Sequence, residues 1–331
     1  MGIKNLLKFF SDQTEIIKEK NHNEYYGKKI AIDISILMYQ VVIAIRNSGS
    51  DLTNMKGEIT SHILGLFNKT ISFLEKGIIP IFVFDGKPPQ LKKKILETRR
   101  QSRKKALEKL SDAKTDSEKI KYLKRSVCIS RVQIDQCREL LNLMGIPYID
   151  APQEADSQLA YLCKENIVYA VLTEDMDILT FGSPRIIRNL TSSKKIPLEI
   201  ELNDVLKKIN LNNEEFIELC ILFGCDYCYN LIDIKPNEIY SVYIKYKSIE
   251  KTLEELKTLG YVIPENFEYI EAKEYFKSSL SNPVIQNDIK MKEPDNDKLL
   301  NLLVNNYGLI KNNIIIKLNR LNILYNKFKD F

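Results

Sequence analysis

The feature that most constrains this fold is a short apolar run that leads into a carboxylate, found three times along the chain. The runs occupy residues 28–33, 78–85 and 168–175. Such runs, separated by longer segments with helical periodicity, predict parallel strands joined by helices. Because sites in these sheets form where strands end, we expect the acids that close the runs to share one edge of the sheet.

The segments around these runs predict helices. Residues 34–46 are apolar enough for a buried helix, and apolar residues recur at helical spacing from Ile59 to Leu74, with Gly77 ending that pattern. From about residue 200 the pattern is mostly helical, with helices expected over 214–223, 236–247, 249–259 and 298–331. The expected fold class is therefore α/β, with a mostly parallel central sheet flanked by helices and a C-terminal helical region.

Length and composition exclude several classes of protein. The chain has 331 residues, of which 44% are hydrophobic, so a large domain with a smaller appended one is expected. No segment approaches the roughly 20 apolar residues of a membrane span, and no membrane partner is expected. The six cysteines, without a secretory signal, indicate reduced thiols in an intracellular protein.

A basic stretch covers residues 87–131. The net charge of +5 is small, so the placement of the charges matters more than their sum. This stretch has few acids and no clear apolar stripe, which is typical of a solvated surface helix. It also lies within the α/β pattern, directly after an acidic strand end. We therefore expect a helical projection over an acidic site, where it would meet a phosphate backbone.

Seven acids supply the candidate chemistry. Taken singly, each is more typical of a helix cap or a turn. Together, and without histidine or cysteine, they would repel one another unless a cation lay among them. Hard cations such as Mg²⁺ prefer oxygen ligands, and two such ions can clamp a phosphodiester displacement. The candidate metal ligands are Asp33, Asp85, Glu154, Asp156, Asp175, Asp177 and Asp226.

The motifs that carry these acids resemble flap endonucleases. They are GEITSH at 57–62, VFDGKPPQLK at 83–92, MGIPY at 144–148 and GCDYC at 224–228, and the resemblance runs in register from Met1 to about residue 280. It implies a PIN-like 5′-nuclease fold with a basic helical arch. It also implies two Mg²⁺ ions, which Mn²⁺ can replace, held by the seven acids. The family usually has Glu where Asp156 stands, so that side chain is one methylene shorter here.

The resemblance also implies roles for other residues. Lys92 and Arg99 match arch residues that contact the scissile phosphate, Tyr39 matches an aromatic that stacks on a terminal base, and Gly2 matches a residue that packs near the site. Where the family has a glycine turn that binds potassium and duplex DNA, this chain has Asp233 and Lys235, so we expect the turn to differ. Further DNA contacts are expected from Arg46, Lys93, Arg103, Lys104, Lys124, Arg125, Arg131 and Lys235.

The expected function is that of a structure-specific 5′ flap endonuclease, with an accompanying 5′–3′ exonuclease activity, in DNA replication and repair. Products would end in 5′-phosphate and 3′-hydroxyl. The expected partner is branched DNA with a 5′ flap, and the expected location is the nucleus. A sliding clamp is a further candidate partner, although residues 327–331 lack the Gln-x-x-aliphatic spacing of its binding motif.

Two other functions fit the same acids. A DNA-binding scaffold without activity would have no need of seven clustered carboxylates. A ribonuclease could use a similar acid-edged sheet, and cleavage of matched RNA and DNA would separate the two. The expected organisation is a nuclease domain over 1–260 and a C-terminal helical region over 261–331. Within the first lie an N-terminal part (1–105), the arch (about 87–131) and an internal part (about 132–260) with a DNA-binding hairpin at about 224–247.

Overall fold

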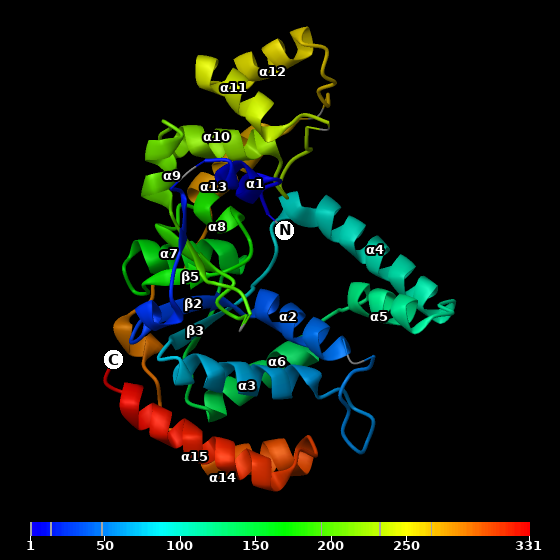
Figure 1. Cartoon of the computed structure of the whole chain (residues 1–331), viewed down its shortest axis with the longest axis vertical. Coiled ribbons are helices and arrows are strands. Elements are labelled where there is room, and N and C mark those ends of the chain that lie inside the picture. The colour runs from blue at the N-terminus through cyan, green and yellow to red at the C-terminus, as the bar shows by residue number, and fades with distance from the viewer. Residues whose placement is uncertain (1, 14, 48, 193, 232, 266) are drawn as a thin grey trace. The chain divides into compact units, whose positions relative to one another are not determined.

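The computed structural model describes residues 2–13, 15–47, 49–192, 194–231, 233–265 and 267–331. Its fold combines β-strands with flanking helices, which confirms the α/β class (Figure 1). The chain divides into two compact units. Unit 1 comprises Met1–His22, Asp85–Ile95 and Ala151–Asn282, and unit 2 comprises Asn23–Phe84, Leu96–Asp150 and Pro283–Phe331.

Unit 1 has four strands in the order β1-β7-β6-β5. Strands β5 and β6 are parallel, whereas β7 pairs antiparallel with both β6 and β1. The strands are β1 (Ile17–Glu19), β5 (Ala170–Leu172), β6 (Arg185–Arg188) and β7 (Leu198–Glu201). The helices are α1 (Leu6–Ser11), α7 (Ala155–Lys164), α8 (Asp177–Thr180), α9 (Leu202–Lys208), α10 (Asn213–Phe223), α11 (Pro236–Tyr246), α12 (Ile249–Thr258) and α13 (Tyr269–Ser278).

Unit 2 has three strands in the order β2-β3-β4, and both pairings are parallel. The first two strands are the predicted ones. The strands are β2 (Lys29–Asp33), β3 (Ile79–Phe84) and β4 (Tyr148–Asp150). The helices are α2 (Ile34–Arg46), α3 (Ser61–Glu75), α4 (Lys93–Ser111, whose first turn lies in unit 1), α5 (Asp116–Arg125), α6 (Arg131–Leu143), α14 (Asn296–Leu300) and α15 (Lys311–Phe328).

The core of unit 2 explains why these elements form. All six residues of β3 are buried, as the central strand of a parallel set requires. Helix α3 buries residues three and four apart, among them Ile63, Leu66 and Phe67. Each such side chain contributes about 1.5–3 kcal/mol on burial. The helix predicted over 298–331 is interrupted by a π-helical turn, Asn301–Asn306, and resumes as α15.

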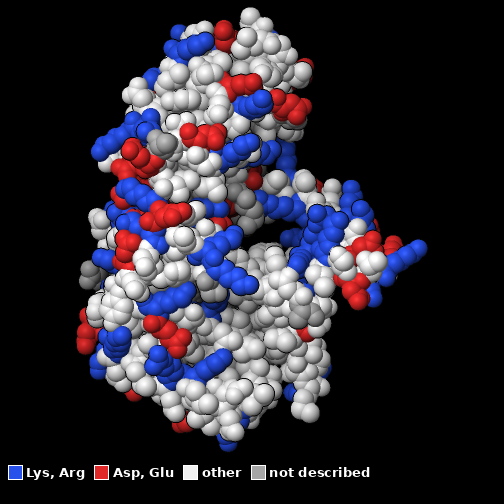
Figure 2. Space-filling view, in the orientation of Figure 1, with Lys and Arg blue, Asp and Glu red and all other residues white. Residues whose placement is uncertain are grey.

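The basic stretch forms two helices with almost no core. Ala106 is the buried residue of α4, and α5 has none among its described residues. Helix α5 begins instead at a capping box, in which Thr115 Oγ1 accepts from Glu118 N at 3.2 Å and Glu118 Oε2 accepts from Thr115 N at 3.3 Å. Lys and Arg side chains gather over these helices (Figure 2). The expected absence of an apolar stripe is confirmed.

None of the helices in the described part of the chain is long and apolar enough to cross a bilayer.

Candidate active site

Six of the seven candidate acids lie in unit 1. The exception is Asp33, which ends β2 in unit 2. Its Oδ1 accepts from Ile36 N at 3.1 Å, so this carboxylate caps α2 at the helix's positive end. Its side chain is buried. The strand and the helix therefore meet at this acid, as the sequence predicts.

Asp85 and Gly86 are hydrogen-bonded to the chain segment at the start of α7. Asp85 Oδ1 accepts from Ala155 N at 2.9 Å, and Gly86 N donates to Gln153 O at 2.5 Å. A Cβ at Gly86 would overlap the carbonyl oxygen of Ala151, so only glycine allows this approach. Glu154, the N-cap of α7, lies between Gln153 and Ala155, the two residues that make these hydrogen bonds. Asp156 follows in the first turn of the same helix.

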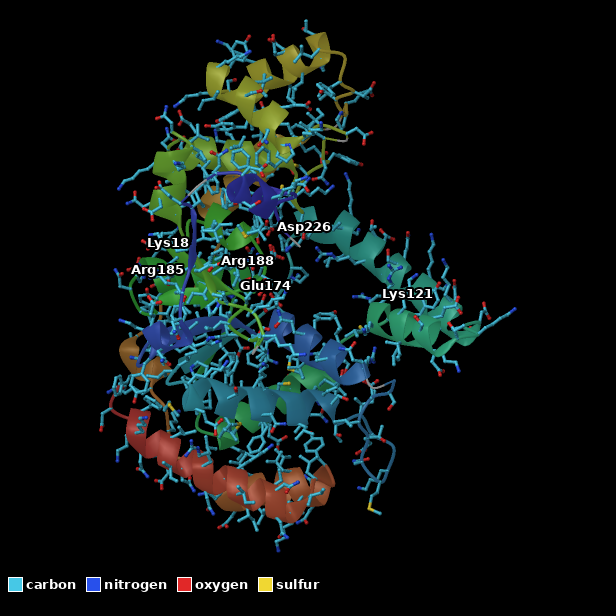
Figure 3. All side chains as sticks on the ribbon, viewed as in Figure 1. Lys18, Lys121, Glu174, Arg185, Arg188 and Asp226 are labelled. Atoms are coloured by element: carbon cyan, nitrogen blue, oxygen red, sulfur yellow. The ribbon has the colours of Figure 1, made fainter. Side chains whose placement is uncertain are left out.

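The segment that follows β5, residues 173–177, is held by hydrogen bonds between its own residues. Thr173 Oγ1 accepts from Asp175 N at 2.9 Å, and Asp175 Oδ1 accepts from Asp177 N at 3.2 Å. Glu174, which lies between Thr173 and Asp175, forms an ion pair with Arg188 of β6 at 2.9 Å, and Figure 3 labels both residues. Arg188 Nη1 also donates to Glu174 O at 2.7 Å. The ion pair therefore anchors the segment on the sheet while Asp175 and Asp177 stay in the interior.

Gly2 packs directly against this segment. It is buried, with a φ of +76°, in the left-handed region that favours glycine. A Cβ there would overlap Asp175 Oδ1 and press on Asp177 Oδ1. The structure thus places Gly2 beside two of the candidate acids.

Lys92 supplies the positive charge among the acids. Its Nζ pairs with Glu154 Oε1 and lies 4.0 Å from Asp226 Oδ2, and its side chain is 9% exposed. Burial alone would lower the pKa of Lys92, but the carboxylates of Asp156 and Glu154 raise it above its usual range. The ammonium is therefore charged and acts as the counter-ion of a buried acid cluster.

Asp177 carries the clearest mark of a cation site. Its side chain is 1% exposed, and neither carboxylate oxygen has a hydrogen-bond partner among the described residues. Burial, and next the charge of Asp175, raise the pKa of Asp177 well above its usual value. Burial also raises the pKa of Asp175. An unpartnered buried carboxylate is costly, and a cation would satisfy it.

The donor set suits a hard cation such as Mg²⁺, because the acids offer only oxygen atoms. As placed, however, no group of three or more His, Cys, Asp or Glu side chains in the described ranges could hold a metal ion together. The carboxylates of Glu154 and Asp226 face the ammonium of Lys92 instead. The chemistry of the residues thus fits the predicted metal, and the positive charge present comes from the protein itself.

Two functional candidates escaped the sequence analysis. The hydroxyls of Tyr227 and Tyr275 both donate to Glu154 Oε2, at 2.8 Å and 3.1 Å. Tyr227 follows Asp226 within the GCDYC motif, and this adjacency is a signal that could have found it. Tyr275 lies on α13, 121 residues from Glu154, and no local pattern marks it.

The remaining predicted DNA contacts are divided between the units. In unit 2, Arg46 pairs with Asp51 at 2.9 Å and donates to Leu123 O at 2.7 Å, so it ties α2 to α5. Tyr39 is half-buried on α2. In unit 1, Lys93 and Lys235 are exposed. Arg99, Arg103 and Lys104 lie on α4, Lys124 and Arg125 on α5, and Arg131 begins α6.

The turn before α11 has an unusual backbone. Asp233 has a φ of +61°, in the left-handed region where Asp and Asn are the commonest residues after glycine. Lys235 N donates to Glu238 Oε2 at 3.2 Å, and Pro236 begins α11. The left-handed conformation therefore forms here without glycine.

Comparisons with known proteins identify the family of this chain. The XPG N-terminal domain family matches residues 1–106, and the XPG I-region family matches residues 145–226. The chain is 43% identical to "Flap endonuclease 1" of Glycine max over 341 aligned positions, which cover 99% of this chain and 88% of the relative. It resembles the structure of flap endonuclease-1 from Methanococcus jannaschii with a TM-score of 0.72 and 32% identity, over 94% of this chain and 96% of that one. The catalytic core of Rad2 in complex with DNA substrate shares the fold, with a TM-score of 0.72 at 24% identity, over 96% of this chain and 100% of that one.

Proposed function

Because the chain belongs to the flap endonuclease family, we propose that it is a structure-specific nuclease that hydrolyses DNA phosphodiester bonds near the base of a 5′ flap. The observation that carries this proposal is the buried cluster around Lys92, where Glu154, Asp226 and their neighbours place carboxylates from separate chain segments against one ammonium. A scaffold protein would gain nothing from confining so much charge, because burying acids costs stability unless a cation compensates them.

We propose that the seven candidate acids hold Mg²⁺, with Mn²⁺ as a substitute. When bound, the metal would supply a water of lowered pKa and a Lewis acid for the phosphate. Asp175 and Asp177 suit this role because they are buried, close together and difficult to ionise side by side. Lys92 and Arg99 would offer positive charge to the phosphate as charge develops on it.

The basic helices α4 and α5 support DNA as the substrate. Their Lys and Arg side chains are mostly exposed, and these helices contribute little to a core. Contacts of this kind neutralise phosphates and carry no sequence information. We therefore propose that the protein recognises the shape of the flap junction and not its base sequence.

Cleavage of a labelled double-flap DNA with Mg²⁺, and separately with EDTA, tests this function. We expect cuts near the flap base only with the metal, leaving 5′-phosphate and 3′-hydroxyl ends. Asp175→Asn serves as the inactive control. A matched RNA flap, cut as fast as the DNA, would favour a ribonuclease. Tight DNA binding with no cleavage under any metal would favour a scaffold.

The family also suggests where the protein acts. We propose a nuclear enzyme of DNA replication and repair, and a fluorescent fusion in the host cell tests the location. A sliding clamp is a second candidate partner on family grounds alone. Titration of the host clamp into the purified chain would measure this interaction directly.

A further inference from the structure

The carboxylate of Glu154 receives three donors from side chains far from it in the sequence. Lys92 pairs with Oε1, while the hydroxyls of Tyr227 and Tyr275 both donate to Oε2. The Glu154 side chain is 10% exposed. An ionised carboxylate only accepts hydrogen bonds, so this arrangement fixes both oxygens of one acid.

Aromatic packing holds the two tyrosines in place. Their rings pack against each other, with centroids 4.7 Å apart, and against Phe181, with centroid distances of 6.2 Å for Tyr227 and 5.9 Å for Tyr275. The hydroxyls are therefore held by aromatic packing that Glu154 does not provide.

Helix α13 carries Tyr275, and the segment that follows α13 is hydrogen-bonded to α7, the helix whose N-cap is Glu154. Ser157 Oγ of α7 donates to Leu280 O at 2.9 Å. Gln158 exchanges two hydrogen bonds with the backbone of Asn282, at 2.7 Å and 3.0 Å. These contacts hold the chain just after α13 on the helix that presents the acid. Tyr275 also lies outside both family matches, which cover residues 1–106 and 145–226.

We propose that Tyr275 and Tyr227 are positioning residues that hold Glu154 for a divalent cation. The inference rests on the proposed function, since it assigns Glu154 to the metal. By occupying Oε2, the two hydroxyls direct Oε1 toward positive charge, which is the ammonium of Lys92 in this structure. Neither tyrosine needs to touch DNA. Partners of this kind orient metal ligands, and losing one typically costs about 10–100-fold in metal affinity or activity.

The test is Tyr275→Phe, which removes the hydroxyl and keeps the ring. Mn²⁺ binding is followed by the electron paramagnetic resonance of the free ion, without DNA. We expect binding about tenfold weaker, because Tyr227 retains one of the two hydrogen bonds. In single-turnover cleavage, the metal concentration at half-maximal rate should rise by a similar factor. Flap affinity without a catalytic metal should not change.

Tyr269→Phe is the matched control. Tyr269 lies on the same helix, but its hydroxyl donates to Glu250, which is not one of the seven candidate acids. We expect Mn²⁺ binding by this variant to equal that of the parent protein. Equal Mn²⁺ affinity in the two phenylalanine variants would overturn the positioning role. A parent protein that neither binds Mn²⁺ nor cleaves flaps would instead overturn the proposed function.

A double-mutant cycle separates positioning from general support of the fold. In a Glu154→Gln background, Tyr275→Phe should have no further effect on Mn²⁺ binding, because the oxygen it orients is no longer a charged ligand. A tenfold loss of Mn²⁺ affinity that persists in this background would show that Tyr275 does not act through Glu154, which would refute the proposal. If Tyr275→Phe does not fold, Tyr227→Phe removes the other hydroxyl from the same oxygen and carries the same expectations.

Discussion

Replacing Lys92 by methionine should destabilise the metal-free protein and leave the metal-bound protein nearly unaffected. The ammonium pairs with Glu154 and lies 4.0 Å from Asp226, with the Lys92 and Glu154 side chains only 9% and 10% exposed. At 4 Å a unit charge pair is worth about 4 kcal/mol for an effective dielectric constant of about 20. Part of this attraction offsets the cost of burying the charges.

The loss in the variant should therefore be about 3 kcal/mol, the lower end of what breaking a buried ion pair costs. Methionine keeps an unbranched side chain as far as its ε carbon and lacks only the terminal nitrogen, so little packing is lost. Urea unfolding in EDTA measures this difference in the free energy of unfolding. At saturating Mg²⁺ the difference should shrink to below about 1 kcal/mol, because the variant, which lacks the competing ammonium, should bind the ion more tightly and be stabilised more by it. Lys93→Met, at the exposed neighbouring position, is the control.

Removing the ammonium should also have opposite effects on metal binding and on cleavage. Mn²⁺ should bind Lys92→Met more tightly, because a competing positive charge has gone, while single-turnover cleavage slows. Equal stability of the variant and the parent protein in EDTA would refute the counter-ion role. A penalty that is the same with and without metal would show that the cation does not take over from Lys92.

Four further outcomes follow from the structure. Asp175→Asn should slow flap cleavage at least roughly a hundredfold while flap affinity, measured by anisotropy, persists; near-normal turnover would remove Asp175 from the site. Arg99→Ala should lower the single-turnover rate more than the affinity, and a change in affinity alone would make it an ordinary backbone contact. In EDTA the free energy of unfolding should fall as pH rises above about 3.9. The reason is that the raised pKa of Asp177 lets the folded state keep a proton that the unfolded chain has lost. Asp177→Asn should flatten this decline. Flap affinity should be the same in K⁺ and in Na⁺ at constant ionic strength, and a marked preference for K⁺ would contradict the expectation of an altered turn. Lys235→Ala should weaken binding most for substrates with long duplex arms.

The predicted elements were those whose signals are local. Helix α2 begins at Ile34, as expected, because Asp33 both closes the strand and caps the helix. Strands β2 and β3 were found because each contains a buried apolar run, Ile30 to Ile32 in β2 and Ile79 to Phe84 in β3. Strand β6 was missed. Its four residues begin and end with arginine, and its pairing with β7 depends on a partner that no local pattern specifies.

Within the candidate site, the sequence supplied the acids but not their partners. The resemblance to flap endonucleases singled out Lys92 within the basic run, but it did not predict that this side chain is buried against Glu154, 62 residues away. No predicted element covered Tyr275, and only the folded chain brings its hydroxyl to the same carboxylate. Motif reading finds residues that act together in one segment. It does not find the donors that distant segments contribute.

The turn at Asp233 shows how a side chain other than glycine can occupy an unusual backbone conformation. The loss of glycine led us to expect a different turn, because a Cβ disfavours the left-handed region. Asp233 nevertheless has a φ of +61°, and aspartate is one of the few side chains that enter this region at modest cost. The side chains of Asp233 and Lys235 are both exposed, so the replacement adds one charge of each sign at the start of α11. If this turn meets DNA, these two charges are what its exposed side chains offer to the phosphates.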